Sequence, residues 1–217
     1  DVVLFLAASQ NDPSDTINSN KFYEISKKYT LRIAKICKKN KIKFIFPSSC
    51  SVYGYGKKEF NEKSKTFPLT NYSKNKIEIE KALSKLACRN FSPIALRFST
   101  VFGFSPRIRL DLVINMLSML AITTKKIILN SNGLAWRPHI NINDVCLAFY
   151  LSIVSDIENG KLNIFNVGHN KNNIRIIDIA KIISKLTKTR IYYKFDKKKS
   201  LIYDRNIKNG ADKRSYK

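Results

Sequence analysis

The sequence predicts an α/β fold in which a doubly wound parallel sheet is followed by a smaller, mixed α/β region. Short apolar runs alternate with longer stretches of helical spacing in the first half of the chain. This alternation is typical of a parallel sheet that carries helices on both faces. With 217 residues, 44% of them apolar, and only 7 Gly and 6 Pro, the chain can bury a full core.

The elements of the predicted sheet follow in order along the chain. Continuous apolar runs indicate strands buried on both faces, and apolar residues that recur every three to five positions indicate helices. In the second helix the apolar stripe is Ile79, Leu83 and Leu86, with Glu80 to its side. The predicted elements are a strand at 2–6, a helix at 15–39, a strand at 41–46, a helix that Asn71 can cap, and a strand at 93–98.

The pattern changes after Gly103, where strands and helices become shorter and more mixed. This predicts a division of the chain into 1–103, which carries the parallel sheet, and 104–217, mainly a smaller lobe with elements that return to the sheet. Its predicted elements are helices at 110–122, 144–154 and 174–186, and strands at 126–129, 163–167 and 191–195.

The chain is strongly basic, with 40 Lys and Arg against 16 Asp and Glu and a formal net charge of +24. A nucleic-acid binder would gather this charge into a patch, whereas these lysines are scattered and no aromatic-interleaved basic motif is present. We therefore expect neither a nucleic acid nor a membrane as partner. The stretch from Lys194 to Lys217 is the most basic and could form an exposed arm.

The four cysteines are widely spaced, no Cys-x-x-Cys occurs, and there are only two histidines. This argues against a metal site and against a disulfide framework, and it favours a reducing, cytoplasmic location. No apolar run reaches the roughly 18 residues of a membrane span, and no signal peptide is evident. Because the chain opens on Asp1 with a strand already running, we expect it to be a fragment.

A cluster of hydroxyls in the segment 47–54, PSSCSVYG, directly follows the second predicted strand. In parallel α/β sheets ligands bind beyond the carboxyl ends of the strands, so these hydroxyls should face the ligand crevice. Tyr72 and Lys76 are four residues apart at the start of the next helix, which places them on one face. A lysine ammonium beside a phenol lowers the phenol pKa from about 10 toward neutrality, and such a tyrosine can transfer a proton.

The spacing Tyr-x-x-x-Lys is weak on its own, because a lysine-rich sequence produces it by chance. Context favours Tyr72–Lys76, which alone opens a helix after the serine-bearing strand, although an ordinary amphipathic helix start is the alternative. The four pairs are Tyr23–Lys27, Tyr53–Lys57, Tyr72–Lys76 and Tyr193–Lys197.

Seven segments in the right order resemble the extended short-chain dehydrogenase/reductase family, and within it the NAD-dependent nucleotide-sugar epimerases and dehydratases. The resemblance implies that 1–103 is the C-terminal part of a dinucleotide-binding domain of Rossmann type and that 104–217 is mainly the nucleotide-sugar-binding lobe. The segments are DVVLFLAAS, FIFPSSCSVYG, PLTNYSKNKIEIEKAL, ALRFSTVFG, WRPHININDV, FNVG and DKRSYK.

The resemblance also implies roles for single residues. Tyr72 would be the catalytic acid/base, Lys76 would hold the nicotinamide ribose and lower the Tyr72 pKa, and Ser49 would be the catalytic serine, with Ser48 and Ser51 as nearby alternatives. The implied cofactor is NAD, with NADP as the alternative. Beyond Tyr72 and Lys76, the implied cofactor contacts are Leu6, Ala7, Ala8 and Asn18.

For the substrate, the resemblance implies a nucleotide-diphosphate sugar clamped by Arg137 and Arg214, whose forked guanidinium groups suit a diphosphate. Ser51, Thr100 and Asn115 would contact the substrate as well. The alternatives are surface ion pairs for the two arginines and a solvated helix position for Asn115. A homodimer through two long helices per subunit is implied too.

Three departures from the family pattern matter. The Gly-rich dinucleotide fingerprint is absent, because all glycines lie at or after Gly54, and about two βα units, roughly 60 residues, would precede Asp1. The fragment alone should therefore hold the cofactor poorly and be inactive. Cys50 and Ser51 replace the acidic pair of the dehydratases, and Thr100 stands where several sugar epimerases have Asn.

Together these features favour NAD-dependent epimerisation of a nucleotide-diphosphate sugar through a transient keto intermediate. Tyr72 would deprotonate a sugar hydroxyl while hydride leaves the same carbon, and hydride would return to the other face. One alternative is an NAD(P)-dependent sugar-nucleotide reductase or dehydrogenase. The other is a catalytically inactive relative that binds polyanions.

Overall fold

The computed structural model describes residues 1–7, 19–56 and 59–194. The chain divides into two compact units. The first unit comprises 1–54, 62–99 and 143–167, and the second comprises 55–61, 100–142 and the described residues from 168 onward. Assignment of a cofactor-binding part at 1–103 and a substrate-binding part at 104–217 stays a prediction.

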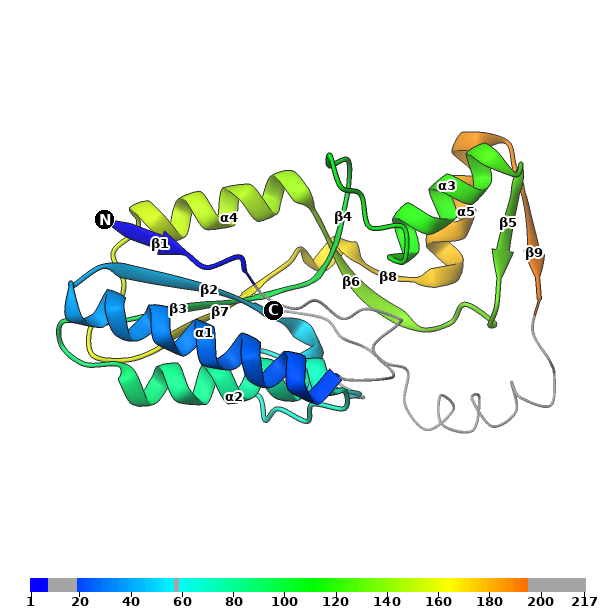
Figure 1. The fold of residues 1–217 in the computed structure, drawn as a ribbon. Coiled ribbons are helices and arrows are strands. Elements are labelled where there is room, and N and C mark those ends of the chain that lie inside the picture. The colour runs from blue at the N-terminus through cyan, green and yellow to red at the C-terminus, as the bar shows by residue number, and fades with distance from the viewer. Residues whose placement is uncertain (8–18, 57–58, 195–217) are drawn as a thin grey trace. The chain divides into compact units, whose positions relative to one another are not determined.

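The first unit is built on a four-stranded sheet, shown in Figure 1. All of its strands are parallel and their order is β1-β2-β3-β7, which confirms the predicted α/β class. The strands are β1 (Val2–Leu4), β2 (Lys43–Ser49), β3 (Ile94–Phe98) and β7 (Asn163–Val167).

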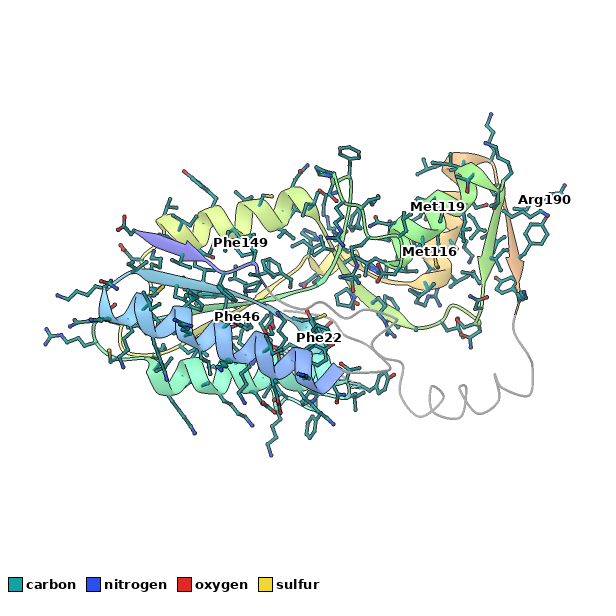
Figure 2. All side chains as sticks on the ribbon, in the orientation of Figure 1. Phe22, Phe46, Met116, Met119, Phe149 and Arg190 are labelled. Carbon is teal, nitrogen blue, oxygen red and sulfur yellow. The ribbon has the colours of Figure 1, made fainter. Side chains whose placement is uncertain are left out.

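Helices cover both faces of this sheet. α1 (Ser19–Lys39) and α2 (Asn71–Leu86) lie side by side on one face, and α4 (Ile142–Val154) lies on the other (Figure 1). Figure 2 labels Phe46 on β2 and Phe149 on α4; the Phe149 ring lies 5.0 Å from that of Phe98. The core between sheet, α1 and α2 consists of Ala34, Cys37, Phe44, Phe46, Ile79, Leu83, Phe91 and Ala95.

A lysine of the sheet compensates the C-terminal end of α4. Lys43 Nζ donates to the carbonyl oxygens of Ser152, Ile153 and Ser155 at 3.4, 2.7 and 3.0 Å. The last turn of α4 has no basic residue of its own. Because the last carbonyls of a helix lack partners within it and carry partial negative charge, this contact fixes α4 against β2.

The structure corrects two strand predictions. β1 ends at Leu4 and forms an edge of the sheet, with Val2 37% and Leu6 57% exposed, so it is not buried on both faces. β2 runs past Phe46 through Ser49. Pro47 is tolerated there because β1 pairs only as far as Ile45. At Pro47 the strand has a neighbour only on the β3 side, so the missing N–H of proline breaks no hydrogen bond with β1.

The second unit contains two small sheets and two helices. β4 and β8 flank β6 in a three-stranded sheet, and the sequence pattern predicted none of these three strands. β5 pairs with β9 in parallel. α3 packs against α5 around Leu117, Ala121, Ile127 and Ile183. The elements are β4 (Thr100–Phe102), α3 (Val113–Thr123), β5 (Lys126–Leu129), β6 (Trp136–Asn141), a 3-10 turn (Asn170–Asn172), β8 (Asn173–Arg175), α5 (Ile176–Thr187) and β9 (Arg190–Tyr193).

Most boundaries in this half differ from the prediction by a few residues, while 126–129 and 163–167 agree with it. In the described part of the chain, no helix is both long and apolar enough to cross a membrane.

Candidate active site

The serine-rich segment forms the end of β2 and the turn after it. β2 closes on Ser48 and Ser49, and Cys50–Tyr53 form a 3-10 turn. Ser49 has extended backbone angles and caps this turn, since its Oγ accepts a hydrogen bond from the Ser51 amide at 3.2 Å. The hydroxyls therefore lie at the carboxyl end of a parallel strand, the edge where α/β sheets bind ligands.

Gly54 allows the chain to leave this turn. Its φ is +67°, and a Cβ placed on it would lie 2.1 Å from the carbonyl oxygen of Phe67. The Phe67 amide in turn donates to the carbonyl of Val52 at 3.0 Å. Only glycine fits both the backbone conformation and the close approach, which returns the loop from the turn to the start of α2.

Thr70, and not the predicted Asn71, caps α2. The Thr70 side chain accepts from the Ser73 amide at 3.1 Å, and Ser73 Oγ accepts from the Thr70 amide at 3.0 Å. This reciprocal capping box satisfies two amides that the first helical turn leaves without partners. The first turn of α2 is thereby fixed, with Tyr72 inside it.

Lys76 is buried, with 3% of its surface exposed. Its Nζ donates to the Pro47 carbonyl at 2.7 Å and lies 5.4 Å from the centre of the Tyr72 ring and 4.7 Å from that of Phe46. Burial lowers the pKa of Lys76 to about 8, and the charge of Glu80 opposes that shift. The predicted spacing thus brings an ammonium against the Tyr72 ring and ties α2 to β2.

The other Tyr-x-x-x-Lys pairs have different surroundings. Tyr23 is buried in α1 with its ring against that of Tyr72, while Lys27 Nζ lies 2.6 Å from Glu78. The Tyr53 hydroxyl bonds to Arg97 and Asn166. The lysines of the two remaining pairs, Lys57 and Lys197, lie outside the described residues.

Of the predicted cofactor contacts beyond Tyr72 and Lys76, Leu6 and Ala7 are described. Both are exposed and directly follow the carboxyl end of β1, where the Phe5 amide still donates to the Ile45 carbonyl at 3.1 Å. Ala8 and Asn18 lie outside the described residues.

The predicted substrate contacts fall into both units. In the first, the Ser51 Oγ is buried and has no hydrogen-bond partner among the described residues. In the second, Thr100 begins β4, and Arg137 of β6 donates from Nη1 to the Trp136 carbonyl at 2.9 Å. Arg214 lies outside the described residues.

Asn115 is a buried residue, so the alternative of a solvated helix position is wrong. Its Oδ1 accepts from the Gly103 amide at 3.3 Å, and its Nδ2 donates to the Arg109 carbonyl at 3.0 Å. Both polar groups of the amide therefore hold the loop between β4 and α3. A contact with substrate stays a prediction.

Sequence reasoning missed a polar cluster at the same sheet edge. Ser99, which follows β3, is 3% exposed, and no described residue gives its Oγ a hydrogen bond. Glu80 and Arg97 are buried and paired, although Glu80 was predicted at the side of the helix. One signal was available: Arg97 is a charge inside an otherwise apolar strand, and a buried charge requires a partner. No group of three potential metal ligands occurs among the residues that the structure describes.

Comparison with known proteins gives consistent matches. A curated ADP-L-glycero-D-manno-heptose-6-epimerase from Brachyspira hyodysenteriae (strain ATCC 49526 / WA1) is 34% identical over 96 residues, which are 42% of this chain and 30% of that protein. The structure of UDP-glucuronic acid 4-epimerase from Bacillus cereus in complex with NAD is 25% identical, with a TM-score of 0.76 over 90% of this chain and 62% of that one.

A further structural match, ADP-L-glycero-D-manno-heptose-6-epimerase from Helicobacter pylori, shares 19% identity and a TM-score of 0.73, over 87% of this chain and 59% of that one. It shows the same fold. The chain thus spans less than two thirds of the length of these relatives. The sequence profile of the family described as NAD dependent epimerase/dehydratase matches residues 1–168. Because this match covers well over half of the sequence, the chain belongs to the NAD dependent epimerase/dehydratase family.

Proposed function

We propose that the protein carrying this chain is an NAD-dependent epimerase of a nucleotide-diphosphate sugar, with Tyr72, Lys76 and Ser49 as its catalytic residues. The observation that carries this proposal is the arrangement of Lys76, whose buried ammonium lies against the Tyr72 ring and is fixed to the strand that ends in Ser49. A buried positive charge beside a phenol stabilises the phenolate.

In this mechanism Tyr72 removes the proton of a sugar hydroxyl, and Ser49 Oγ hydrogen-bonds the same oxygen. Bound NAD would take up hydride from the sugar carbon and return it to the opposite face of the keto sugar. Tyr72 then returns the proton to the inverted hydroxyl. No net oxidation results, so one cofactor serves many turnovers.

The residues present fit a nicotinamide ribose. An ammonium has three N–H donors, and the hydrogen bond of Lys76 that the structure records goes to Pro47, which leaves donors for ribose hydroxyls. Leu6 and Ala7, at the carboxyl end of β1, and Ala8 and Asn18 would add cofactor contacts. The Bacillus cereus relative is described as a complex with NAD, which supports this choice of cofactor.

The substrate class rests on the relatives, whose names give UDP-glucuronic acid and an ADP-heptose as the compounds they act on. Both are nucleotide-diphosphate sugars. We assign the diphosphate to Arg137 and Arg214 and further contacts to Ser51, Thr100 and Asn115. Cys50 is a buried thiol next to Ser51, and neither can provide the pair of carboxylates that a dehydratase uses, so epimerisation is favoured over dehydration.

The assembly that we propose is a homodimer through α1 and α2. Phe22, Ile25, Tyr29 and Ile36 are 58, 44, 56 and 48% exposed and give α1 an apolar outer face, beside α2. An apolar row of this kind on a surface helix suits a second copy of the same helix. We also propose a cytoplasmic location, because all four cysteines are free thiols.

The test is the interconversion of sugar epimers by the protein that carries this chain, supplied with NAD and either UDP-sugars or ADP-heptoses and followed by NMR. Tyr72→Phe should lower the rate at least about 100-fold, the usual contribution of an acid/base group. The control is Tyr150→Phe, a change at an exposed tyrosine of α4. Stoichiometric consumption of NADH or NADPH would instead identify a reductase.

A further inference from the structure

A buried carboxylate one turn after Lys76 bonds to two strands. Glu80 is 3% exposed, and its Oε1 accepts from Ser48 Oγ at 2.5 Å and from Arg97 Nε at 3.1 Å. Its Oε2 accepts from Arg97 Nη2 at 2.6 Å. Three hydrogen bonds, two of them from one guanidinium, define the position of this carboxylate closely.

The partners of Glu80 belong to a row across the sheet. Ser48, Arg97 and Asn166 are register neighbours on β2, β3 and β7, so their side chains share one face. Arg97 Nη1 donates to the Tyr53 hydroxyl at 2.7 Å, and Tyr53 donates to Asn166 Oδ1 at 2.6 Å. The Glu80 carboxylate is thus held by a continuous buried network beneath α2.

Stability alone does not account for a buried ion pair in this place. Desolvation of two charges offsets much of their attraction, and apolar residues of similar volume often serve as well. Glu80 stands four residues after Lys76, so both lie on one face of α2 at adjacent turns. Removal of the Glu80 charge would therefore change the protonation of Lys76, in addition to any effect on the stability of the fold.

Among the described residues, Glu80 is the acidic group whose charge acts on Lys76. Lys76 contacts the Phe46 ring and the Pro47 carbonyl of β2, and it contacts the Tyr72 ring of its own helix, α2. α1 contributes Tyr23, which contacts Tyr72. β3 contributes Arg97, which lies on the far side of Glu80 and pairs with it.

We propose that Glu80 is a positioning residue for Lys76, whose buried negative charge keeps the Lys76 ammonium protonated beside Tyr72, while Arg97 sets how much of that charge Lys76 experiences. The catalytic meaning of this coupling rests on the proposed function. The coupling itself is a property of the chain without cofactor or substrate. The direction of the Lys76 pKa agrees with it, since burial lowers that pKa and Glu80 opposes the change.

This proposal predicts shifts of opposite sign for the two partners of the ion pair. Glu80→Gln removes the negative charge, so the Lys76 pKa should fall by about one unit or more from its value near 8. Arg97→Met leaves the carboxylate uncompensated, so the Lys76 pKa should rise. If the ion pair only holds α2 against the sheet, both variants loosen the packing around Lys76. In that case both variants should raise the Lys76 pKa toward the value of an ordinary lysine.

The measurement is an NMR titration of isotope-labelled lysine side chains, in which Lys76→Met identifies the Lys76 signal. Glu78→Gln is the matched control, because Glu78 is an exposed glutamate of the same helix that pairs with Lys27, and it should leave Lys76 unchanged. Where a single variant fails to fold, Glu80→Gln with Arg97→Met removes both charges together, and the Lys76 pKa should still fall. An unchanged or higher value in a folded Glu80→Gln or double variant would overturn the proposal.

The same variants separate this inference from the proposed function. In the protein that carries this chain, Glu80→Gln should change the pH dependence of the epimerisation rate. The change should follow the fall in the Lys76 pKa that the titration measures. Glu80→Asp, which keeps the charge, should restore part of the wild-type profile. If Glu80→Gln lowers the Lys76 pKa but the wild-type protein shows no epimerase activity, the coupling is supported and the proposed function is contradicted. If the protein is an active epimerase but Glu80→Gln leaves the Lys76 pKa unchanged, the function is supported and the coupling is contradicted.

Discussion

The Nζ atom of Lys76 lies 2.7 Å from the carbonyl oxygen of Pro47, and this contact joins the second turn of α2 to the last residues of β2. A charge buried for its chemistry should cost stability. Its removal is therefore a test that separates catalysis from folding.

We predict that Lys76→Met abolishes epimerase activity and stabilises the fold near neutral pH. An unfolded lysine titrates near 10.4 and the folded one near 8, so between these values the unfolded chain binds more protons and stability rises with pH. Below pH 8 the buried ammonium costs roughly 3 kcal/mol, which Lys76→Met should recover. Urea unfolding of both proteins at several pH values measures this, and equal stability at neutral pH would contradict it.

His139 should destabilise the second unit in acid. The side chain is 1% exposed, and neither ring nitrogen has a hydrogen bond of normal geometry with a described residue. Burial lowers the His139 pKa to about 4, against weaker opposing effects of the Arg137 and Asn172 backbone. Since the unfolded histidine binds protons near 6.5, stability should fall as the pH drops from 6.5 toward 4.

His139→Phe should remove this acid dependence and raise the midpoint of thermal unfolding, because an apolar ring replaces a buried imidazole that makes no hydrogen bond of normal geometry with a described residue. The Phe102 ring already packs at 6.5 Å from the His139 ring, so a second aromatic ring suits the site. Thermal unfolding at neutral and acidic pH checks both points. A lower midpoint for the variant would show that the imidazole has a partner.

Gly54→Ala should be more harmful than Gly160→Ala. Both glycines have positive φ, +67° and +82°, so both variants meet backbone strain. At Gly54 the ψ of −140° also lies outside the left-handed helical region, which makes the strain larger there. Only at Gly54 does the added Cβ meet the Phe67 carbonyl oxygen, whereas nothing lies within 4 Å of it at Gly160. The backbone conformation and the close approach therefore both make the loss of unfolding free energy larger for Gly54→Ala. Chemical unfolding of the two variants measures this, and equal losses would contradict it.

Thr70→Ala should destabilise α2 by about 1 kcal/mol, because it removes the side-chain oxygen that accepts from the Ser73 amide, while the hydrogen bond from the residue 70 amide to Ser73 Oγ can remain. Asn71→Ala should have a smaller effect, since Asn71 is exposed in the first helical turn. Chemical unfolding of the two variants compares them directly. A larger loss of unfolding free energy for Asn71→Ala would show that Asn71 is the capping residue.

The apolar face of α1 should control assembly. Tyr29→Glu places a charge among Phe22, Ile25 and Ile36 and should shift the proposed dimer toward monomer. Ile122→Glu, at a 61% exposed position of α3, is the control and should leave the mass unchanged. Sedimentation of the protein that carries this chain measures the mass, and a monomeric wild type would contradict the proposal.

The sequence predicted those features that depend on local pattern. Apolar runs located the parallel strands, and the four-residue spacing located Tyr72 and Lys76 on one helix face. The predicted end of β2 was wrong because the apolar run stops at Phe46 while the strand continues through Pro47, and the tolerance of Pro47 depends on where β1 stops pairing. That information lies in another segment of the chain.

The polar cluster illustrates the same limit. Glu80 was placed at the side of its helix, because an isolated helix pattern shows no partner for it. Its burial depends on Arg97, 17 residues later, and on Ser48, 32 residues earlier. Similarly, the sequence left a substrate contact and a solvated helix position open for Asn115, and its burial depends on the loop from Gly103 to Arg109, which bonds to both polar groups of its amide. Partners from distant strands decide these positions, and helical periodicity does not contain them.

The span of the network beneath α2 has a consequence for synthesis on the ribosome. The hydrogen bond from Tyr53 to Asn166 joins residues 113 positions apart, and Asn166 lies on β7, the last of the described strands of this sheet along the chain. A nascent chain can therefore form α1, β2 and α2 well before the Tyr53–Arg97 end of the network has its final acceptor. Contacts of such long separation form late and slowly. Helix α2 is thus made early and acquires its complete support only when β7 emerges.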